Sequence, residues 1–327
     1  MERESKVCII GCGLIADYHT EAIQEVDGLE VIGYFDKNPV RAEEMATKTN
    51  TRAFGSLEEI WTSETDSVSI CTPSGTHGSL AVEAMLAGKH AIVEKPLALT
   101  EAELNRILEI ERVTGKICAP ISQHRFSQGV LTAKQILNEN RLGRIIGVNT
   151  IIRYHRDPAY YSSSPWKGTV SMDGGVLMNQ GIHALDIMCY LNGWPEQVQG
   201  MCGTLHHRIE AEDTAAAVMR FPDGHFGTVI ATTAAACGRP WRMEIFGTEG
   251  SLTLEEDILT LINDIPQTTV NRTGGFDRPD GIPVTEHILQ LKNISDALHN
   301  KAALSYTAED AAKTVRLILE ITEARKR

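Results

Sequence analysis

The sequence lacks the features that mark membrane proteins and disulfide-rich scaffolds. No run of apolar residues approaches the roughly 20 that a membrane-spanning helix needs. The seven cysteines are odd in number and form no C-x-x-C pair, as is usual in a reducing compartment. The first residues are charged and lack the apolar stretch of a signal peptide. We therefore expect a cytoplasmic protein with no membrane partner.

Basic residues are also scarce, with 31 Lys and Arg against 43 Asp and Glu and a net charge of −12. Nucleic-acid binding depends on basic patches that neutralise phosphates, whereas the basic residues here are scattered. We expect no nucleic-acid partner. The pair His206-His207 does not predict a metal site, because adjacent strand residues point to opposite faces and no set of partner ligands lies nearby.

The first 121 residues alternate short apolar runs with helical patterns. Helix starts are marked by Asn38-Pro39 and by capping boxes that begin at Ser56 and Thr100. Strands are predicted over residues 7–10, 29–35, 68–71, 90–93 and 116–119. This alternation predicts an α/β domain over residues 1–121, built on a parallel sheet with helices on both faces.

Past residue 145 the pattern changes to consecutive strands joined by tight turns. Turns at residues 222–224 and 247–250 separate strand-like stretches and contain the glycines that reversing chains use. Two apolar helical stripes follow, around Leu291 and around Val315. We expect an α+β domain over residues 122–327 with a largely antiparallel open sheet, whose last helix packs back on the first domain.

A glycine-rich loop, Gly11-Cys12-Gly13-Leu14-Ile15-Ala16, joins the first predicted strand to a helix. In this context G-x-G-x-x-A is typical of a Rossmann dinucleotide site, with the pyrophosphate on the helix N-terminus. Asp36 ends the second strand, where a carboxylate binds ribose hydroxyls and repels a 2′-phosphate. NAD is thus favoured over NADP, although Lys37 weakens the preference. The alternative for Asp36 is a turn or cap residue before Asn38-Pro39.

Two further segments follow predicted strands, at the sheet edge where ligands bind in open α/β folds. They are Cys71-Thr72-Pro73-Ser74-Gly75-Thr76-His77 and Glu94-Lys95-Pro96. The place of Lys95 between a strand end and a proline favours an active-site role. A solvated surface lysine is the alternative.

Polar residues recur along the segment that begins at Gly174. Asn179, His183 and Asp186 are spaced at i, i+4 and i+7, which predicts one shared helix face. Oxidation of an alcohol needs a base for the hydroxyl proton, and histidine suits that task near neutral pH. We predict His183 as this base, with a core or capping histidine as the alternative.

Together these motifs resemble the glucose–fructose oxidoreductase, inositol dehydrogenase and rhizopine-catabolism (Gfo/Idh/MocA) family. The resemblance covers essentially the whole chain. It rests on the glycine loop, Cys71-Thr72-Pro73, Glu94-Lys95-Pro96, Gln123-His124-Arg125-Phe126, residues 174–186 and the turn at 247–250. The pattern from Trp166-Lys167-Gly168 to His183 is similar to the branch of UDP-N-acetylglucosaminuronate and other sugar 3-dehydrogenases.

The resemblance implies roles for particular residues. Lys95 would stabilise charge on the reacting oxygen, His183 would be the general base, and Asn179 would complete the catalytic set. NAD would contact Gly11, Gly13, Leu14, Ile15, Asp36, Thr72, Pro73, His77, Glu94, Lys95, Gln123 and Arg125. Many family members carry Asp where this chain has Asn179, and Asn cannot stabilise an imidazolium by charge. Asp186 is an alternative residue for orienting His183.

Aromatic and basic residues precede the predicted catalytic helix. Such groups suit a sugar, because aromatic faces pack on its C–H side and charged groups bind its hydroxyls. Substrate contacts are predicted for Arg153, Tyr154, Arg156, Trp166, Lys167, Asn179, His183 and, by the resemblance, His287. This set fits a polar sugar, including an anionic one, and the alternative is an edge strand and loop with ordinary aromatics.

We expect an NAD-dependent dehydrogenase of a sugar or polyol hydroxyl, forming a homodimer or homotetramer as is common in the family. The alternatives are an NAD-dependent glycosidase of the same fold and a non-catalytic NAD-binding regulator. Net accumulation of NADH distinguishes the dehydrogenase from the glycosidase. The presence of both Lys95 and His183 argues against the regulator.

Overall fold

The computed structural model describes residues 4–263, 265–266 and 284–323. The chain divides into two units, one within Met1–Gln123 and Gly274–Ala312, the other within His124–Thr273 and Lys313–Arg327. Helix α9 (Thr285–Leu298), which the sequence analysis assigned to the second domain, is therefore grouped with the first unit.

The first unit is built on a six-stranded parallel sheet with the order β3-β2-β1-β4-β5-β6. The order reverses between β1 and β4, the point at which doubly wound folds bind dinucleotides. The predicted strands are confirmed, and β3 is added. The bounds are β1 Ser5–Ile10, β2 Leu29–Phe35, β3 Arg52–Ala53, β4 Ser67–Ile70, β5 His90–Val93 and β6 Cys118–Pro120.

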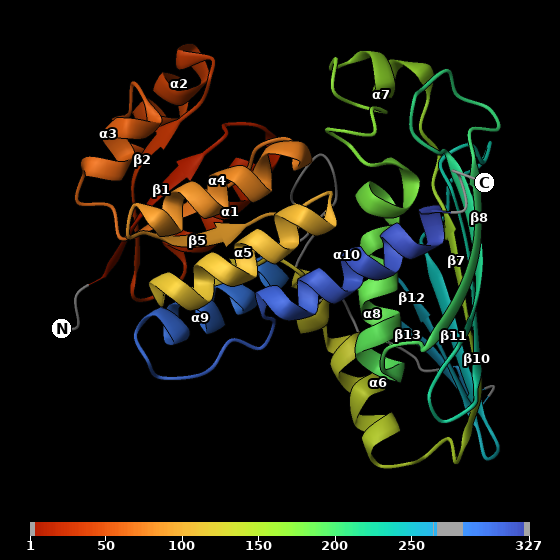
Figure 1. Ribbon diagram of the computed structural model, residues 1–327. Helices are drawn as coiled ribbons and strands as arrows, with labels where there is room; N and C mark the ends of the chain where they lie inside the picture. Colours follow the sequence, from red (N-terminus) through yellow and green to blue (C-terminus); the bar gives the residue numbers. More distant parts are fainter. Residues whose placement is uncertain (1–3, 264, 267–283, 324–327) are drawn as a thin grey trace. The chain divides into compact units, whose positions relative to one another are not determined.

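The helices of this unit begin where the sequence predicted. The Asn38 side chain accepts from the Val40 amide, Ser56 accepts from the Glu59 amide, and Thr100 accepts from the Glu103 amide, each at 3.2 Å. Leu291 and Ile294 of α9 join the core formed by the sheet. The helices are α1 Leu14–Gln24, α2 Pro39–Thr49, α3 Leu57–Thr62, α4 His77–Leu86, α5 Glu101–Thr114 and α9 (Figure 1).

The second unit contains an eight-stranded sheet with the order β14-β13-β12-β11-β7-β10-β9-β8. Its neighbouring strands pair antiparallel, except that β10 and β7 are parallel. The sheet is therefore mixed but largely antiparallel, as predicted. The bounds are β7 Ile145–Arg153, β8 Gln197–Gly203, β9 Thr214–Arg220, β10 Phe226–Thr232, β11 Arg242–Gly247, β12 Ser251–Glu255, β13 Ile258–Ile262 and β14 Ile265–Pro266.

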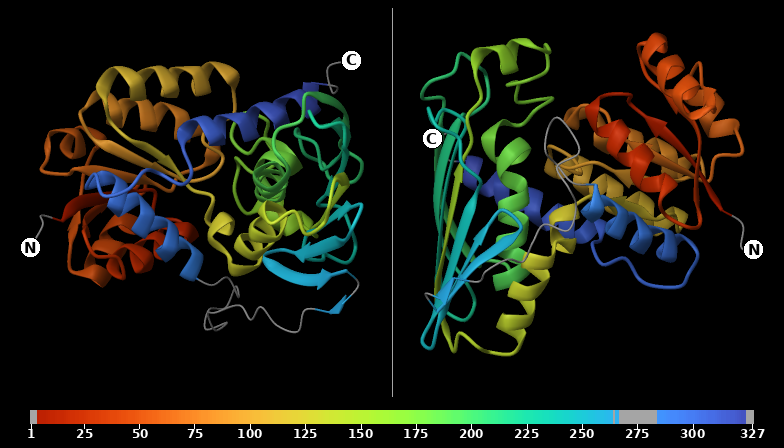
Figure 2. Two further views of the ribbon diagram at one scale, coloured as in Figure 1. Left: turned by 90° about the horizontal axis from the view of Figure 1, so that it is seen from below. Right: turned by 180° about the vertical axis from the view of Figure 1, so that it is seen from behind.

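Helices cover one face of this sheet and leave the other face open (Figures 1 and 2). On the covered face, α6 (Gln128–Asn138) and α8 (Ile182–Asn192) pack over buried residues such as Val148 and Ile245. The last helix, α10 (Ala308–Glu323), contacts β8 within this unit, where the Cys202 thiol donates to the Thr322 carbonyl.

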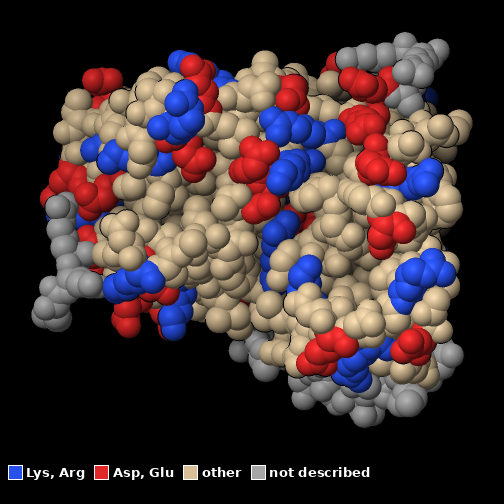
Figure 3. Space-filling model, turned by 60° about the horizontal axis from the view of Figure 1, so that its bottom comes forward, with Lys and Arg blue, Asp and Glu red and all other residues tan. Residues whose placement is uncertain are grey.

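Acidic and basic side chains are interspersed with wide uncharged regions on the face shown in Figure 3. None of the helices in the described part of the chain has both the length and the apolar character that a membrane crossing requires. These observations agree with the scattered charges and short apolar runs of the sequence.

Candidate active site

Gly11 occupies a position that only glycine fits without strain. Its φ is +93°, and a Cβ there would lie 2.7 Å from the Cys71 carbonyl oxygen at the end of β4. The Gly11 amide donates to the Phe35 carbonyl at 2.7 Å, which ties the loop to β2. The loop is thereby held against the ends of two central strands.

Gly13 has a different role, because nothing lies within 4 Å of the position of its Cβ. It is the N-cap residue of α1, so no side chain there accepts bonds from the amides of the first turn. Next to it, Leu14 is 70% exposed. An uncapped helix N-terminus beside open space fits the pyrophosphate of a dinucleotide.

Asp36 holds the glycine loop and also starts the next turn. One carboxylate oxygen accepts from the Cys12 amide and the other from the Asn38 amide, both at 2.8 Å. The turn role considered in the sequence analysis is therefore present. A carboxylate has about four acceptor sites, so two amide bonds leave capacity for ribose hydroxyls.

His77 connects the loops that follow β4 and β5. Its Nδ1 lies 2.7 Å from the Pro96 carbonyl oxygen, and its Nε2 lies 2.7 Å from the Thr72 carbonyl oxygen. The ring is 1% exposed, and burial lowers its pKa. The predicted cofactor residue thus directs both ring nitrogens at the protein and holds the loop that carries Lys95.

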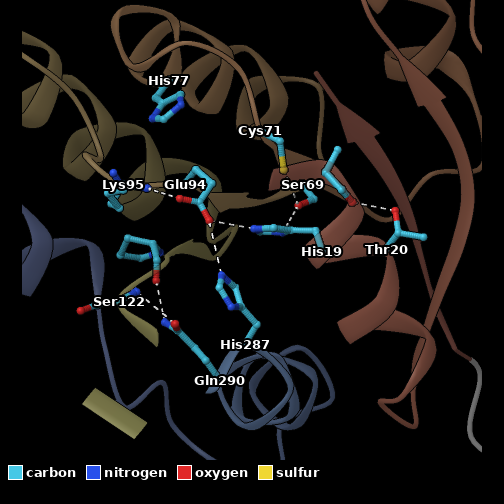
Figure 4. A network of polar contacts seen from close by, with 12 residues as sticks. His19, Thr20, Ser69, Cys71, His77, Glu94, Lys95, Ser122, His287 and Gln290 are labelled. Carbon is cyan, nitrogen blue, oxygen red and sulfur yellow. Dashed lines mark hydrogen bonds and ion pairs between the residues drawn. The ribbon is translucent and has the colours of Figure 1, made fainter. Parts of the chain in front are cut away.

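Glu94 forms a buried ion pair with His19 behind this loop (Figure 4). The His19 Nε2 lies 2.9 Å from one carboxylate oxygen, and the other oxygen accepts from the Lys95 amide at 3.1 Å. On the far side of the ring, Nδ1 lies 2.7 Å from the Ser69 hydroxyl. The side chains of His19 and Glu94 are 0% and 8% exposed.

The electrostatics of this pair favour its charged form. Burial by itself would raise the pKa of Glu94, but the hydrogen bond and charge of His19 lower it to about 2. Burial would lower the pKa of His19, but Cys71 and Glu94 raise it to about 10. His19 and Ser69 were missed in the sequence, where the only signal is a polar residue inside an apolar segment.

The structure corrects the prediction for His287. Instead of being available to a substrate, this side chain is 1% exposed and contacts the rings of Tyr18 and His19 in the first unit. The His287 Nε2 lies 4.0 Å from Glu94. Ligand atoms of His19, Glu94 and His287 lie within 4.8 Å of one another, as metal ligands can. The short His19–Glu94 bond pairs two of them, and we interpret the cluster as an ion pair.

In the second unit, the predicted catalytic helix begins with a π-helical turn over Leu177–Gly181 and continues as α8. This wider turn changes the register, so Asn179 is not on one continuous α-helix with His183 and Asp186 as predicted. The Asn179 amide donates to the Asp173 carboxylate and lies 3.5 Å from the Tyr160 hydroxyl. π-helical turns recur at functional sites.

His183 lies against a second histidine. The centroids of the His183 and His124 rings are 4.4 Å apart, with an angle of 76° between the planes. The Nδ1 of His124 lies 2.7 and 2.8 Å from the two carboxylate oxygens of Asp257. Sequence reasoning missed Asp257, which follows two glutamates in the turn between β12 and β13.

Arg125 and Asp186 pair with each other, which the sequence analysis did not predict. Arg125 donates to both oxygens of Asp186 at 2.7 and 2.6 Å, and Thr314 donates to one of them at 3.0 Å. Both side chains of the pair are less than 10% exposed. The Arg125 guanidinium is thus bound within the second unit by the carboxylate of Asp186.

The predicted substrate residues gather around Tyr160. Arg156 and Lys167 both lie over its ring, at 4.7 and 4.1 Å from the centroid, and the Lys167 ammonium is 5.9 Å from the Trp166 ring. Burial, together with the charge of Asp173, raises the pKa of Tyr160. Tyr154 lies 5.9 Å from the Arg156 guanidinium.

Arg153 is the exception among these residues. Strand residues alternate between faces, and the neighbouring Ile152 is buried on the face where α8 packs. Arg153 is exposed and belongs to the open face of the sheet. The structure therefore separates Arg153 from the substrate residues, contrary to the prediction.

Comparison with known proteins agrees with this geometry. A family model described as "Oxidoreductase family, NAD-binding Rossmann fold" matches residues 5–121, and one for the "GFO/IDH/MocA C-terminal domain" matches residues 130–253. The chain belongs to the Gfo/Idh/MocA oxidoreductase family. The predicted family, fold class and NAD cofactor are confirmed, and the protein is an NAD-dependent dehydrogenase.

Several members of the Gfo/Idh/MocA family are similar over most of the chain. The scyllo-inositol 2-dehydrogenase (NAD⁺) of Bacillus subtilis (strain 168) is 27% identical over 274 residues, covering 80% of this chain and 78% of its own. The WlbA dehydrogenase from Bordetella pertussis, crystallised with NADH and UDP-GlcNAcA, superposes with a TM-score of 0.90 at 26% identity. That match covers 100% of this chain and 96% of the WlbA chain.

A shorter match links the chain to a nucleotide-sugar enzyme. The UDP-N-acetylglucosamine 3-dehydrogenase of Acidithiobacillus ferrooxidans is 30% identical over 193 residues, covering 57% of this chain and 53% of that protein. The relatives thus include enzymes named for inositols and for nucleotide sugars.

Proposed function

We propose that this protein oxidises a ring hydroxyl of an anionic sugar derivative, reversibly and with NAD as hydride acceptor. The observation that carries the proposal is the pair of cations, Arg156 and Lys167, held over Tyr160 beside Asn179. Among the described residues, the buried Nε of Arg156 has no hydrogen-bond partner. A carboxylate or phosphate on the substrate would satisfy it.

Side chains of the protein then accept the hydroxyl proton and stabilise the charge that develops on the substrate oxygen. His183 takes the hydroxyl proton, and Lys95 stabilises the negative charge that forms on the same oxygen. NAD, when bound, supplies the acceptor for the hydride. Asn179 binds a substrate hydroxyl and is itself oriented by Asp173. In the reverse direction His183 returns the proton.

Gly11, Gly13 and Asp36 would hold NAD, because the loop is close to the strand ends, the helix N-terminus is uncapped and the carboxylate has free acceptor capacity. Gln123 adds a buried amide oxygen that lacks a hydrogen-bond partner within the described chain. Such an acceptor fits a donor on the cofactor, for example a carboxamide. Leu14, Ile15, Thr72 and Pro73 line the same loops and complete the proposed cofactor site.

Turnover of Lys95→Met and His183→Ala variants tests the proposal. Each is expected to lose about 10²–10⁴-fold in kcat, as for proton-transfer groups. Arg156→Gln should raise KM for an anionic sugar and leave KM for a neutral polyol unchanged. The control is Arg220→Gln, which replaces a half-exposed arginine in β9 and should change neither KM. Glycoside cleavage without net NADH would instead support the glycosidase alternative.

We also propose that the open face of the second unit's sheet binds a second copy of the chain. Strand register places apolar side chains beside one another on that face, and each is more than 40% exposed. They are Met201, Val218, Phe226, Ile230 and Phe246. Exposed apolar patches of this kind mark interfaces. Phe226→Lys should shift the mass measured by sedimentation towards the monomer, while a monomeric wild type would contradict the proposal.

A further inference from the structure

We propose that His124 and Asp257 are positioning residues for His183, and that Asp257 supplies the negative charge that Asn179 cannot. The inference rests on His183 acting as the base in the proposed function. It answers a question raised by the sequence, namely what stabilises the imidazolium in a chain that carries Asn179. The charge of Asp186 is already paired with Arg125, and Thr314 donates to the same carboxylate.

Short contacts join His124 and Asp257. His124 belongs to the short helix η2 (Gln123–Phe126), and Asp257 lies in the turn between β12 and β13. The two oxygens of Asp257 lie 2.7 and 2.8 Å from Nδ1, and the two side chains are 21% and 10% exposed. An ionised carboxylate only accepts hydrogen bonds, so Nδ1 of His124 carries the proton.

The His124–Asp257 pair contacts His183 through the imidazole ring of His124. The 4.4 Å separation and 76° angle between the two rings give an edge-to-face contact, which restrains the plane of the His183 imidazole. When His183 takes a proton, its positive charge arises one ring away from the Asp257 carboxylate. That arrangement favours the imidazolium and raises the basicity of His183.

Other ionisable groups surround this pair and contribute to the local field. Burial raises the pKa of Tyr154, and the charges of Glu256 and Asp257 raise it further, whereas Arg156 lowers it. Tyr154 is therefore close to all three charged side chains. Arg125 and Asp186 compensate each other as an ion pair. Asp173 contacts Asn179 and the Gly168 amide. Apart from Asp257 itself, the variants below leave all of these groups unchanged.

The test is the pH profile of kcat/KM for oxidation by the full chain with NAD⁺. Asp257→Asn keeps a hydrogen-bond acceptor for His124 but removes the charge. We expect the acid limb of the kcat/KM profile of Asp257→Asn to move to lower pH by roughly one unit. We expect the kcat of this variant to fall about tenfold. His124→Phe keeps both the ring contact and the charge of Asp257, so its acid limb should move less than that of Asp257→Asn. Asp257→Glu should keep the wild-type limb.

The chain offers a matched control in His225 and Asp223. These residues also pair through Nδ1, and His225 stacks on Phe221. They border a pocket that Asn192 also lines, at the opposite end of α8 from His183. Asp223→Asn should leave the acid limb unchanged.

The outcomes separate this inference from the proposed function. An unchanged acid limb in Asp257→Asn, or a loss of kcat without a shift, overturns the positioning role while His183→Ala stays inactive. Wild-type turnover in His183→Ala overturns both. Far-UV circular dichroism of each variant, together with rescue by Asp257→Glu, distinguishes these results from misfolding.

Discussion

Replacing Glu94 by Gln should destabilise the first unit strongly, because the change leaves His19 buried without its counter-charge. Removing one partner of a buried ion pair typically costs about 3–5 kcal/mol. The side chains of His19 and Glu94 are 0% and 8% exposed, so water cannot replace the lost charge. At 2–4 °C per kcal/mol, the unfolding midpoint of this unit should fall by roughly 6–20 °C.

The effect should also depend on pH in a defined direction. His19 keeps its proton in the folded state up to about pH 10, whereas the unfolded chain loses it near its ordinary pKa of 6.5. The stability difference between wild type and Glu94→Gln should therefore be largest below pH 6.5 and shrink as the pH rises towards 10. On the acid side, it should be lost as the pH falls from 4.5 through about 2.

Differential scanning calorimetry from pH 4 to 10, without cofactor, measures this difference. Asp17→Asn is the control, because the Lys48–Asp17 pair is exposed and should contribute less than about 1 kcal/mol. A Glu94→Gln protein that unfolds within 2 °C or so of wild type, or a difference that does not change with pH, would refute the assignment of a charged pair.

Gly11→Ala should lower the unfolding midpoint by several degrees because its Cβ would meet the Cys71 carbonyl, whereas Gly13→Ala should fold normally and weaken NADH binding about tenfold by calorimetry. Asp36→Ser should weaken NAD⁺ binding and reverse the preference against NADP⁺, and equal loss for both cofactors would contradict the ribose role. Arg125→Lys cannot keep both bonds to Asp186, so thermal unfolding should begin several degrees lower.

Local signals were sufficient to predict the fold. The strands of the first unit have apolar runs, three of its helices have side-chain caps, and the glycine loop has both a strand before it and Asp36 after it. Such features depend on neighbouring residues in the sequence. The grouping of α9 with the first unit was not predicted, because its apolar stripe shows that it packs but not against which partner.

The site was predicted less completely because its contacts join residues that are far apart in sequence. His19 and Glu94 are 75 positions apart, and His124 and Asp257 are 133 apart. Their residue types alone suggest no pairing. Similarly, the π-helical turn before His183 displaces Asn179 from the face that a regular helix predicts. Arg125 and His287 were assigned to ligands, and their contacts with Asp186 and His19 were not predicted.

The most direct test of the account is NADH fluorescence after mixing the wild-type protein and NAD⁺ with two substrate pools. One pool holds nucleotide sugars and sugar acids, and the other holds free inositols and neutral hexoses. We predict a rise with the anionic pool that disappears in His183→Ala and weakens in Arg156→Gln. A rise with the neutral pool alone, or an equal rise in His183→Ala, would contradict the proposed substrate class or the proposed base.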